Sequence, residues 1–322
     1  MSSGNREECN EVCCNDENPG FGNPKACCFD LEHNMASEDG PDMKVDPQRA
    51  SQLIEQLSSV QQRMSAVAAK SLRPSKAPVR LVAVSKLKPA TDILALHSPP
   101  ASHLHFGENY VQELLEKSRL LPPEIRWHFI GTLQSNKCQV LARDVRGLWA
   151  VESVDSVKKA KLLDKGRGER RLNNGSGTDG VAGVEPLKVF VQVNTSGEKS
   201  KSGVEPDSNE FIELSIFIRD MCPNLRLQGL MTIGALARSQ ATATETENPD
   251  FAILRETREK LAGRLGIAEL ELELSMGMSE DFEGAILMGS DEVRVGSTIF
   301  GQRPPKNEAQ LQQGAMGESQ AI

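Results

Sequence analysis

The feature that most constrains the fold of this chain is an alternation of short apolar runs with amphipathic stretches. Eight runs rich in Val, Ile and Leu occur between residues 79 and 296, and helical stretches separate them. Such runs are typical of parallel strands buried on both faces, with helices as the outer layer. The expected strands are 79–85, 103–106, 127–131, 148–152, 187–194, 225–232, 269–275 and 292–296, and helices are expected at 109–119, 156–165, 209–221, 251–265 and 281–288.

Eight β/α units in roughly 220 residues predict a single (β/α)8 TIM barrel, slightly shorter than the ~250 residues usual for that fold. An open doubly wound sheet is the alternative, but no Gly-x-Gly-x-x-Gly follows the first strand. An extra helix is expected before the barrel, from Pro47. Its apolar residues recur at helical spacing: Leu53, Ile54, Leu57, Val60, Met64 and Val67.

The charge of the chain is concentrated at its N-terminus. Residues 1–46 carry three basic and eleven acidic side chains, and this balance of −8 equals that of the whole chain. We expect a disordered acidic tail at 1–46, a barrel domain at 47–303 and a disordered C-terminal tail at 304–322. The N-terminal tail also holds five of the seven cysteines. Their spacing does not match most zinc sites, so thiols without a specific role are favoured over a metal site.

The composition also limits the partners and the compartment. No apolar run is long enough to cross a bilayer, and a sequence pI near 5.4 argues against nucleic acid as the main partner. Only two cysteines remain outside the tail, and no presequence is evident, so we expect a cytoplasmic protein, and a monomer. Two stretches depart from the β/α rhythm: 166–185, expected to be a flexible surface insertion, and 235–248, expected to be a slack loop or a mobile lid.

In a barrel of this kind the ligand lies at the carboxyl ends of the strands, and Lys86 follows the first strand. Alternation places it on the face of Val82 and Val84. Partial desolvation would lower the pKa of its amine and favour Schiff-base formation with an aldehyde. A surface lysine at the start of a loop is the alternative, which position alone favours.

Arg294 lies inside the last expected strand, between Val293 and Val295, so its side chain points away from theirs. A guanidinium inside a barrel needs a partner. An interior carboxylate, such as Glu292 or Glu152, is one possibility. A ligand atom, such as a ring nitrogen held unprotonated, is the other.

Small polar residues follow the last two strands, where this fold commonly binds phosphate. We assign an anion to Ser275, Gly296 and Ser297, because backbone N–H groups freed by glycine suit a phosphate. Asn109 and His128 could also touch a ligand, although a cap and a core histidine are the simpler interpretations. No grouping in the barrel region has metal-ligand spacing, and no serine-hydrolase elbow or ATP-binding loop occurs.

Six motifs of the chain together resemble those of the YggS/PROSC family of pyridoxal phosphate homeostasis proteins. They are LVAVSK at 81–86, HFGENYVQE at 105–113, WHFIGTLQSNK at 127–137, GLMT at 229–232, LSMGMS at 274–279 and VRVGSTIFG at 293–301. The resemblance extends from about Pro47 to Arg303 and leaves out the acidic tail and the glycine-rich insertion.

The resemblance implies a barrel of the alanine-racemase N-terminal type with pyridoxal 5′-phosphate (PLP) bound to Lys86 as a Schiff base. It also implies Arg294 at the pyridine nitrogen, the phosphate near Ser275, Gly296 and Ser297, and Met276 and Asn109 close by. The family is known for PLP binding and for vitamin B6 and amino-acid balance, without an established turnover.

The leading hypothesis is therefore a non-catalytic PLP carrier or regulator, whose partners would be PLP-dependent apoenzymes. An arginine at the ring nitrogen weakens the ring as an electron sink, and only a short segment follows the last strand to supply a second base. A PLP-dependent racemase or lyase is the alternative. A barrel that binds another phosphorylated metabolite is the third hypothesis.

Overall fold

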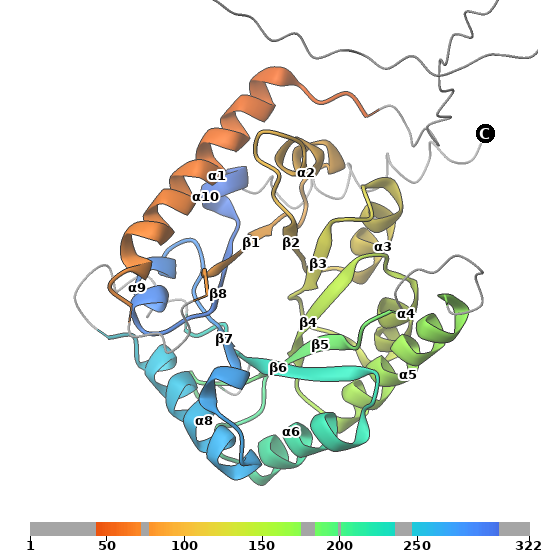
Figure 1. Ribbon diagram of the computed structural model, residues 1–322, viewed down its shortest axis with the longest axis vertical. Coiled ribbons are helices and arrows are strands. Elements are labelled where there is room, and N and C mark those ends of the chain that lie inside the picture. Colours follow the sequence, from red (N-terminus) through yellow and green to blue (C-terminus); the bar gives the residue numbers. More distant parts are fainter. Residues whose placement is uncertain (1–42, 72–76, 175–183, 199–200, 236–246, 303–322) are drawn as a thin grey trace, which may run out of the picture. The chain divides into compact units, whose positions relative to one another are not determined.

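The protein is described here by a computed structural model, which covers residues 43–71, 77–174, 184–198, 201–235 and 247–302. In these residues eight parallel strands form a closed barrel in which each strand pairs with the next and β8 pairs with β1 (Figure 1). The (β/α)8 prediction is confirmed. The expected tails lie outside the described residues, except for 43–46.

The strands are β1 (Arg80–Val84), β2 (His105–Glu108), β3 (Arg126–Phe129), β4 (Leu148–Val154), β5 (Leu187–Gln192), β6 (Leu225–Met231), β7 (Glu273–Ser275) and β8 (Glu292–Val295). The helices are α1 (Pro47–Ala68), α2 (Ala90–His97), α3 (Val111–Leu120), α4 (Ser135–Asp144), α5 (Val157–Asn174), α6 (Asn209–Met221), α8 (Pro249–Leu265), α9 (Phe282–Leu287) and α10 (Ser297–Phe300), with a 3-10 turn η1 (Glu269–Glu271). Among the helices so described, none combines the length and apolar character that a membrane span requires.

The strands separate an apolar outer layer from an interior that holds polar side chains and a small apolar cluster of Ala150, Phe190 and Met231. Residues that point outward, such as Val293 and Val295 of β8, pack with the helices in one continuous hydrophobic core. The alternate residues point into the barrel, and Val82 is in register with Arg294 of the neighbouring strand. Because side chains alternate across a strand, one face of the sheet builds the hydrophobic core and the other carries the buried polar side chains of the barrel interior.

Helix α1 covers the place where the first and last strands meet. Asp46 begins it, accepting a hydrogen bond from the Gln48 N–H at 3.1 Å, and Pro47 stands in the first turn. Arg49 bonds Asp92 of α2 at 2.7 Å, and Arg63 bonds Glu283 of α9 at 2.7 Å. Because α10, which follows β8, is one short turn, the helix that precedes the barrel covers this side instead (Figure 1).

The predicted surface insertion at 166–185 is wrong in its first half. Helix α5 continues through this stretch to Asn174, and both Gly166 and Arg167 are buried. A Cβ at Gly166 would lie 2.3 Å from the carbonyl oxygen of Gln139 in α4. The glycine therefore permits close packing of two helices and does not break one.

Other sequence predictions held with small changes at the boundaries. The seventh strand was expected over 269–275, but its first residues form η1, and only Glu273–Ser275 pairs in the sheet. Residues 175–183 of the expected insertion and 236–246 of the expected loop or lid lie outside the described part of the chain.

The packing of α1 predicts the effect of a substitution. Leu57 is 1% exposed on the inner side of this helix. Leu57→Ala should lower the free energy of unfolding by ~2–5 kcal/mol, because it removes buried methyl groups and leaves a cavity. Urea unfolding measures the change. Glu55→Ala, on the exposed side of the same helix, should stay within ~0.5 kcal/mol of the parent; equal losses for the two variants would contradict a packed α1.

Candidate functional site

Lys86 opens the loop after β1 and lines a small pocket between the carboxyl ends of β1 and β8. The other residues that line the pocket are Val84, Lys88, Gly296, Ser297 and Gly301. Strands β1 and β8 are neighbours in the closed sheet, with Ala83 paired to Val295, so the loops that follow them meet. The structure thus brings together Lys86, Gly296 and Ser297, which were predicted from two ends of the sequence.

The backbone at Gly296 comes very close to β1. A Cβ built on Gly296 would lie 3.3 Å from both the Cβ and the carbonyl oxygen of Val84, tighter than ordinary contact. The Gly296 N–H donates to Ser279 Oγ at 3.2 Å, and α10 starts at the next residue, Ser297. The first N–H groups of a helix have no partner within it, so this corner offers donors to an anion.

Arg294 points into the barrel, as its place in the strand predicted, and it is 5% exposed. Its Nη1 donates to Ser275 Oγ at 2.6 Å, and its Nη2 donates to the Thr232 carbonyl at 2.7 Å. The carboxylate of Glu152 lies 3.7 Å from Nη1. The expected interior carboxylate is therefore present, and the two hydrogen bonds use two of the five N–H groups of a guanidinium.

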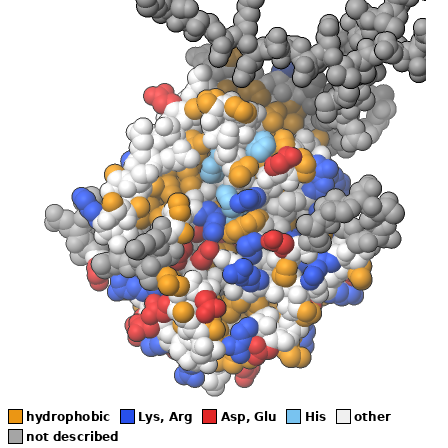
Figure 2. Space-filling view, viewed as in Figure 1, with side chains coloured by type: hydrophobic (Ala, Val, Ile, Leu, Met, Phe, Trp, Pro, Cys, Tyr) orange, Lys and Arg blue, Asp and Glu red, His pale blue; other side chains and the backbone are white. Residues whose placement is uncertain are grey.

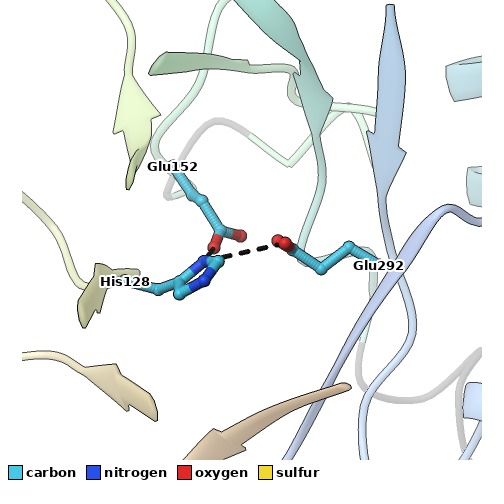
Figure 3. Close-up of side chains that lie close together, drawn as sticks. All are labelled: His128, Glu152 and Glu292. Carbon is cyan, nitrogen blue, oxygen red and sulfur yellow. Dashed lines mark hydrogen bonds and ion pairs between the residues drawn. The ribbon is translucent and has the colours of Figure 1, made fainter. Parts of the chain in front are cut away.

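Three buried side chains, those of His128, Glu152 and Glu292, converge inside the barrel (Figure 3). His128 Nδ1 lies 2.8 Å from Glu152 Oε1 and 3.6 Å from Glu292 Oε2, and all three residues are fully buried. On the other side of its ring, His128 Nε2 lies 2.8 Å from His105 Nδ1. The interpretation of His128 as a satisfied core residue is confirmed.

Ser275 Oγ links these carboxylates to Arg294. It lies 2.7 Å from Glu152 Oε2 and 3.0 Å from Glu292 Oε1, and it also accepts the hydrogen bond from Arg294. A hydroxyl has one proton to donate, so it cannot satisfy both carboxylates at once. A proton on one of the two acids completes the arrangement.

Burial sets the protonation of this cluster. Desolvation, followed by the charge of Glu152, raises the pKa of Glu292 to about 7. Desolvation lowers the pKa of His128 to about 4 and that of His105 to about 2. The histidines are thus neutral at pH 7, whereas Glu292 titrates near that pH.

His128, Glu152 and Glu292 also offer ligand atoms within 4.8 Å of one another, which is close enough for a metal ion. Arginines already lie beside both carboxylates: Arg80 Nη1 donates to Glu292 at 2.9 Å, and Arg294 lies 3.7 Å from Glu152. Two guanidinium charges beside the carboxylates oppose a divalent cation. We therefore assign the cluster to the hydrogen-bond network around Arg294.

Two of the predicted site residues have other surroundings than expected. Ser275 Oγ does not line the Lys86 pocket, and it touches two carboxylates that would repel a phosphate. Its hydroxyl accepts from Arg294, and its contact with a phosphate stays a prediction. Met276 points outward, fully buried in the hydrophobic core between strands and helices, so its side chain does not reach the pocket.

Asn109 follows β2, and its Oδ1 atom is buried with no hydrogen-bond partner among the described residues. Buried polar atoms are rarely left unpaired, so this oxygen suits a donor from a ligand. Asn109 therefore remains a candidate.

Sequence reasoning missed several residues near the pocket. Lys88 lines it and donates to the Gln302 carbonyl at 2.9 Å, while Ser279 accepts from the Gly296 N–H. A larger cavity of about 230 Å³ lies at the ends of β5 and β6, between Gln192 and Gly234. On the face viewed in Figure 1, lysine and arginine side chains gather in the middle beside histidines (Figure 2), whereas no histidine lines the Lys86 pocket.

The family model for the N-terminal domain of alanine racemase matches residues 56–304. A pyridoxal phosphate homeostasis protein of Schizosaccharomyces pombe is 45% identical over 233 residues, which are 72% of this chain and 88% of the relative. This chain belongs to the pyridoxal phosphate homeostasis protein family. The resemblance seen in the six sequence motifs is thereby confirmed.

A human relative and a solved structure show the same similarity. The homologue of Homo sapiens is 44% identical over 255 residues, 77% of this chain and 85% of that protein. The structure of PipY from Synechococcus elongatus, solved with PLP bound, is 31% identical in sequence and has a TM-score of 0.55. The match covers 78% of this chain and 100% of PipY.

The raised pKa of Glu292 predicts a pH-dependent stability. Its folded pKa of about 7 lies above the ordinary value of 4.5, so the folded protein keeps a proton that the unfolded chain loses in this range. The contribution of Glu292 to stability is therefore full below pH 4.5 and falls as pH rises to 7, by at most ~1.4 kcal/mol per pH unit.

Glu292→Gln removes this titration and keeps the shape of the side chain. The free energy of unfolding of the parent minus that of the variant should fall by roughly 1–3 kcal/mol between pH 5 and 7.5, measured by urea unfolding without cofactor. His128 titrates in the opposite sense, but in both proteins, so the subtraction removes most of its effect. A difference that stays constant over this range would rule out a buried proton at Glu292.

Proposed function

We propose that this protein binds PLP reversibly through the amine of Lys86 and holds it for release to PLP-dependent apoenzymes, without turnover of its own. The observation that carries the proposal is that Lys86 shares one pocket with Gly296 and Ser297. An amine and a glycine-bordered helix start are the two groups that an aldehyde-bearing phosphate ester requires. The names of the relatives and the PLP-bound structure of PipY support this function.

The residues present fit the cofactor at three points. Lys86 would hold it covalently, the helix start that follows Gly296, at Ser297, would hold its phosphate, and Asn109 Oδ1 offers a buried acceptor with no hydrogen-bond partner among the described residues. A side chain on Gly296 would press on Val84, so glycine keeps this corner open. When bound, PLP supplies an aldehyde that condenses with amines and an aromatic ring that withdraws electrons.

The role of Arg294 argues for holding over turnover. Ser275 and the Thr232 carbonyl fix its guanidinium, which would donate to the ring nitrogen. A nitrogen held in this way stays unprotonated, which weakens the ring as an electron sink. His128, an acid or base in other settings, is fully buried and bonded to Glu152 and His105, so it is not exposed to a substrate.

The remaining expectations complete the proposal. We infer a monomer that acts in the cytoplasm, with a barrel domain at 47–303 between two tails at 1–46 and 304–322. Cys138 and Cys222, the two cysteines of the barrel domain, are free and buried, which suits a reducing compartment.

Replacing Lys86 tests covalent binding. Lys86→Ala should lose the visible absorption of the loaded protein and the mass increase that borohydride reduction fixes on the peptide around position 86, because the amine that forms the Schiff base is gone. Lys158→Ala, an exposed lysine of α5, is the matched control and should behave as the parent. If Lys86→Ala keeps the same colour and retains PLP as firmly as the parent, the proposed site is wrong.

Hydrogen exchange distinguishes a carrier from an enzyme. PLP-loaded protein incubated with single-enantiomer amino acids in deuterium oxide should exchange their Cα hydrogens no faster than free PLP at the same concentration, because a ring nitrogen held unprotonated by Arg294 weakens the ring as an electron sink. Mass spectrometry and chiral chromatography measure the exchange and any racemisation. Steady exchange that Lys86→Ala abolishes would favour the racemase or lyase instead.

A further inference from the structure

We propose that Lys117 is a positioning residue that fixes the backbone on both sides of Lys86 and thereby aims its amine into the pocket. The proposal rests on the proposed function of Lys86. Lys117 lies on α3, outside the pocket, and it acts through two carboxylates, those of Glu108 and Glu113.

The first half of the argument is the saturation of one buried ammonium group. Lys117 is 6% exposed, and its Nζ donates to Glu113 Oε1 at 2.6 Å, to Glu108 Oε1 at 2.7 Å and to the Ser85 carbonyl at 2.9 Å. An ammonium has three N–H groups, and the three contacts use them all. One of these contacts fixes the peptide group that joins Ser85 to Lys86.

The second half concerns the residue that follows Lys86. Glu113 Oε1 accepts a hydrogen bond of 2.7 Å from the backbone N–H of Leu87. Leu87 has a φ of 61°, in the left-handed region that costs free energy for a residue with a branched side chain. A charge-assisted hydrogen bond to its N–H offsets that cost. The same ammonium group is thus linked to the residue before Lys86 and to the residue after it.

Electrostatics makes these contacts depend on Lys117. Glu108 is fully buried on β2, where it also accepts from Ser85 Oγ at 2.7 Å, and desolvation raises the pKa of its carboxyl. Glu113 is part-buried beside it. Two carboxylates this close repel each other unless a cation lies between them. Without Lys117, Glu113 would lose the charge that holds it next to Leu87.

The side chains of Lys117, Glu108 and Glu113 form one cluster. Among the hydrogen bonds of the described residues, this cluster contacts backbone atoms only at Ser85 and Leu87. A support for the barrel as a whole would not need to select residues 85 and 87 or to hold a leucine in a left-handed conformation. The geometry therefore points to control of the Lys86 turn, in the way that supporting contacts fix a reactive group.

The test uses the full-length protein freed of cofactor. PLP is added, and attachment to Lys86 is followed over time by visible absorption and by borohydride trapping with peptide mapping. Lys117→Met, which keeps the side-chain length and removes the charge, should slow attachment at Lys86 roughly 10- to 100-fold. It should also raise the fraction of PLP trapped at other lysines. Lys159→Met, which removes another part-buried helical lysine paired with an acid four residues away, should change neither.

A second pair of variants covers the case in which Lys117→Met does not fold. Glu113→Ala removes the acceptor of the Leu87 N–H and leaves the bonds of Lys117 to Glu108 and Ser85. It should slow attachment in the same way. Adding Leu87→Gly should restore much of the rate, because glycine adopts a φ of 61° without the cost. A purely structural role of the cluster predicts no such rescue.

The outcomes separate this inference from the proposed function. If PLP attaches at Lys86 in the parent but Lys117→Met and Glu113→Ala attach it at parental rates, the positioning role is wrong and the function stands. If slow attachment in Glu113→Ala is not relieved by Leu87→Gly, the cluster acts on stability alone and the inference fails. If Lys86→Ala binds PLP like the parent, the proposed function itself fails.

Discussion

The interior of this barrel depends on partners that compensate the charge of Arg294, which is buried inside a closed ring of strands. An unpaired buried guanidinium would cost several kcal/mol. Here Ser275 and the Thr232 carbonyl accept its hydrogen bonds, and Glu152 places a negative charge 3.7 Å away. His128 in turn holds Glu152. The guanidinium is thus oriented by the protein alone, and a ligand that meets it does not have to reorganise it.

Hydrophobic periodicity predicted the eight strands because both faces of a barrel sheet are covered, which produces apolar runs that few other folds share. It failed at a glycine, because glycine can either begin a loop or allow two helices to pack closely. Gly166 was interpreted as the start of a loop, but the contact with Gln139 that explains it belongs to a neighbouring helix and has no local signal. The end of β7 was predicted well and its beginning was not, since η1, with the sequence Glu-Leu-Glu, continues the alternation of polar and apolar residues that β7 shows.

The same limits apply to the site. Lys86, Gly296 and Ser297 could be placed together because the first and last strands of a closed barrel are neighbours, and alternation alone gave the direction of Arg294. Met276 was expected near the cofactor from the family resemblance alone, whereas alternation next to the inward Ser275 would have placed its side chain outward. The partners of Ser275 were beyond prediction, because Glu152 is 123 residues away in sequence. No spacing rule connects Lys117 with the backbone at Lys86.

The pocket lies at the seam where the ends of the folded chain meet, and this has a consequence for its assembly. The bond between Arg80 and Glu292 joins residues 212 positions apart, and α1 packs across the same seam. Contacts of such long range form late in folding. The corner that we propose for the cofactor therefore forms only once the ring has closed, and a ligand bound there would favour the closed ring over any opened form.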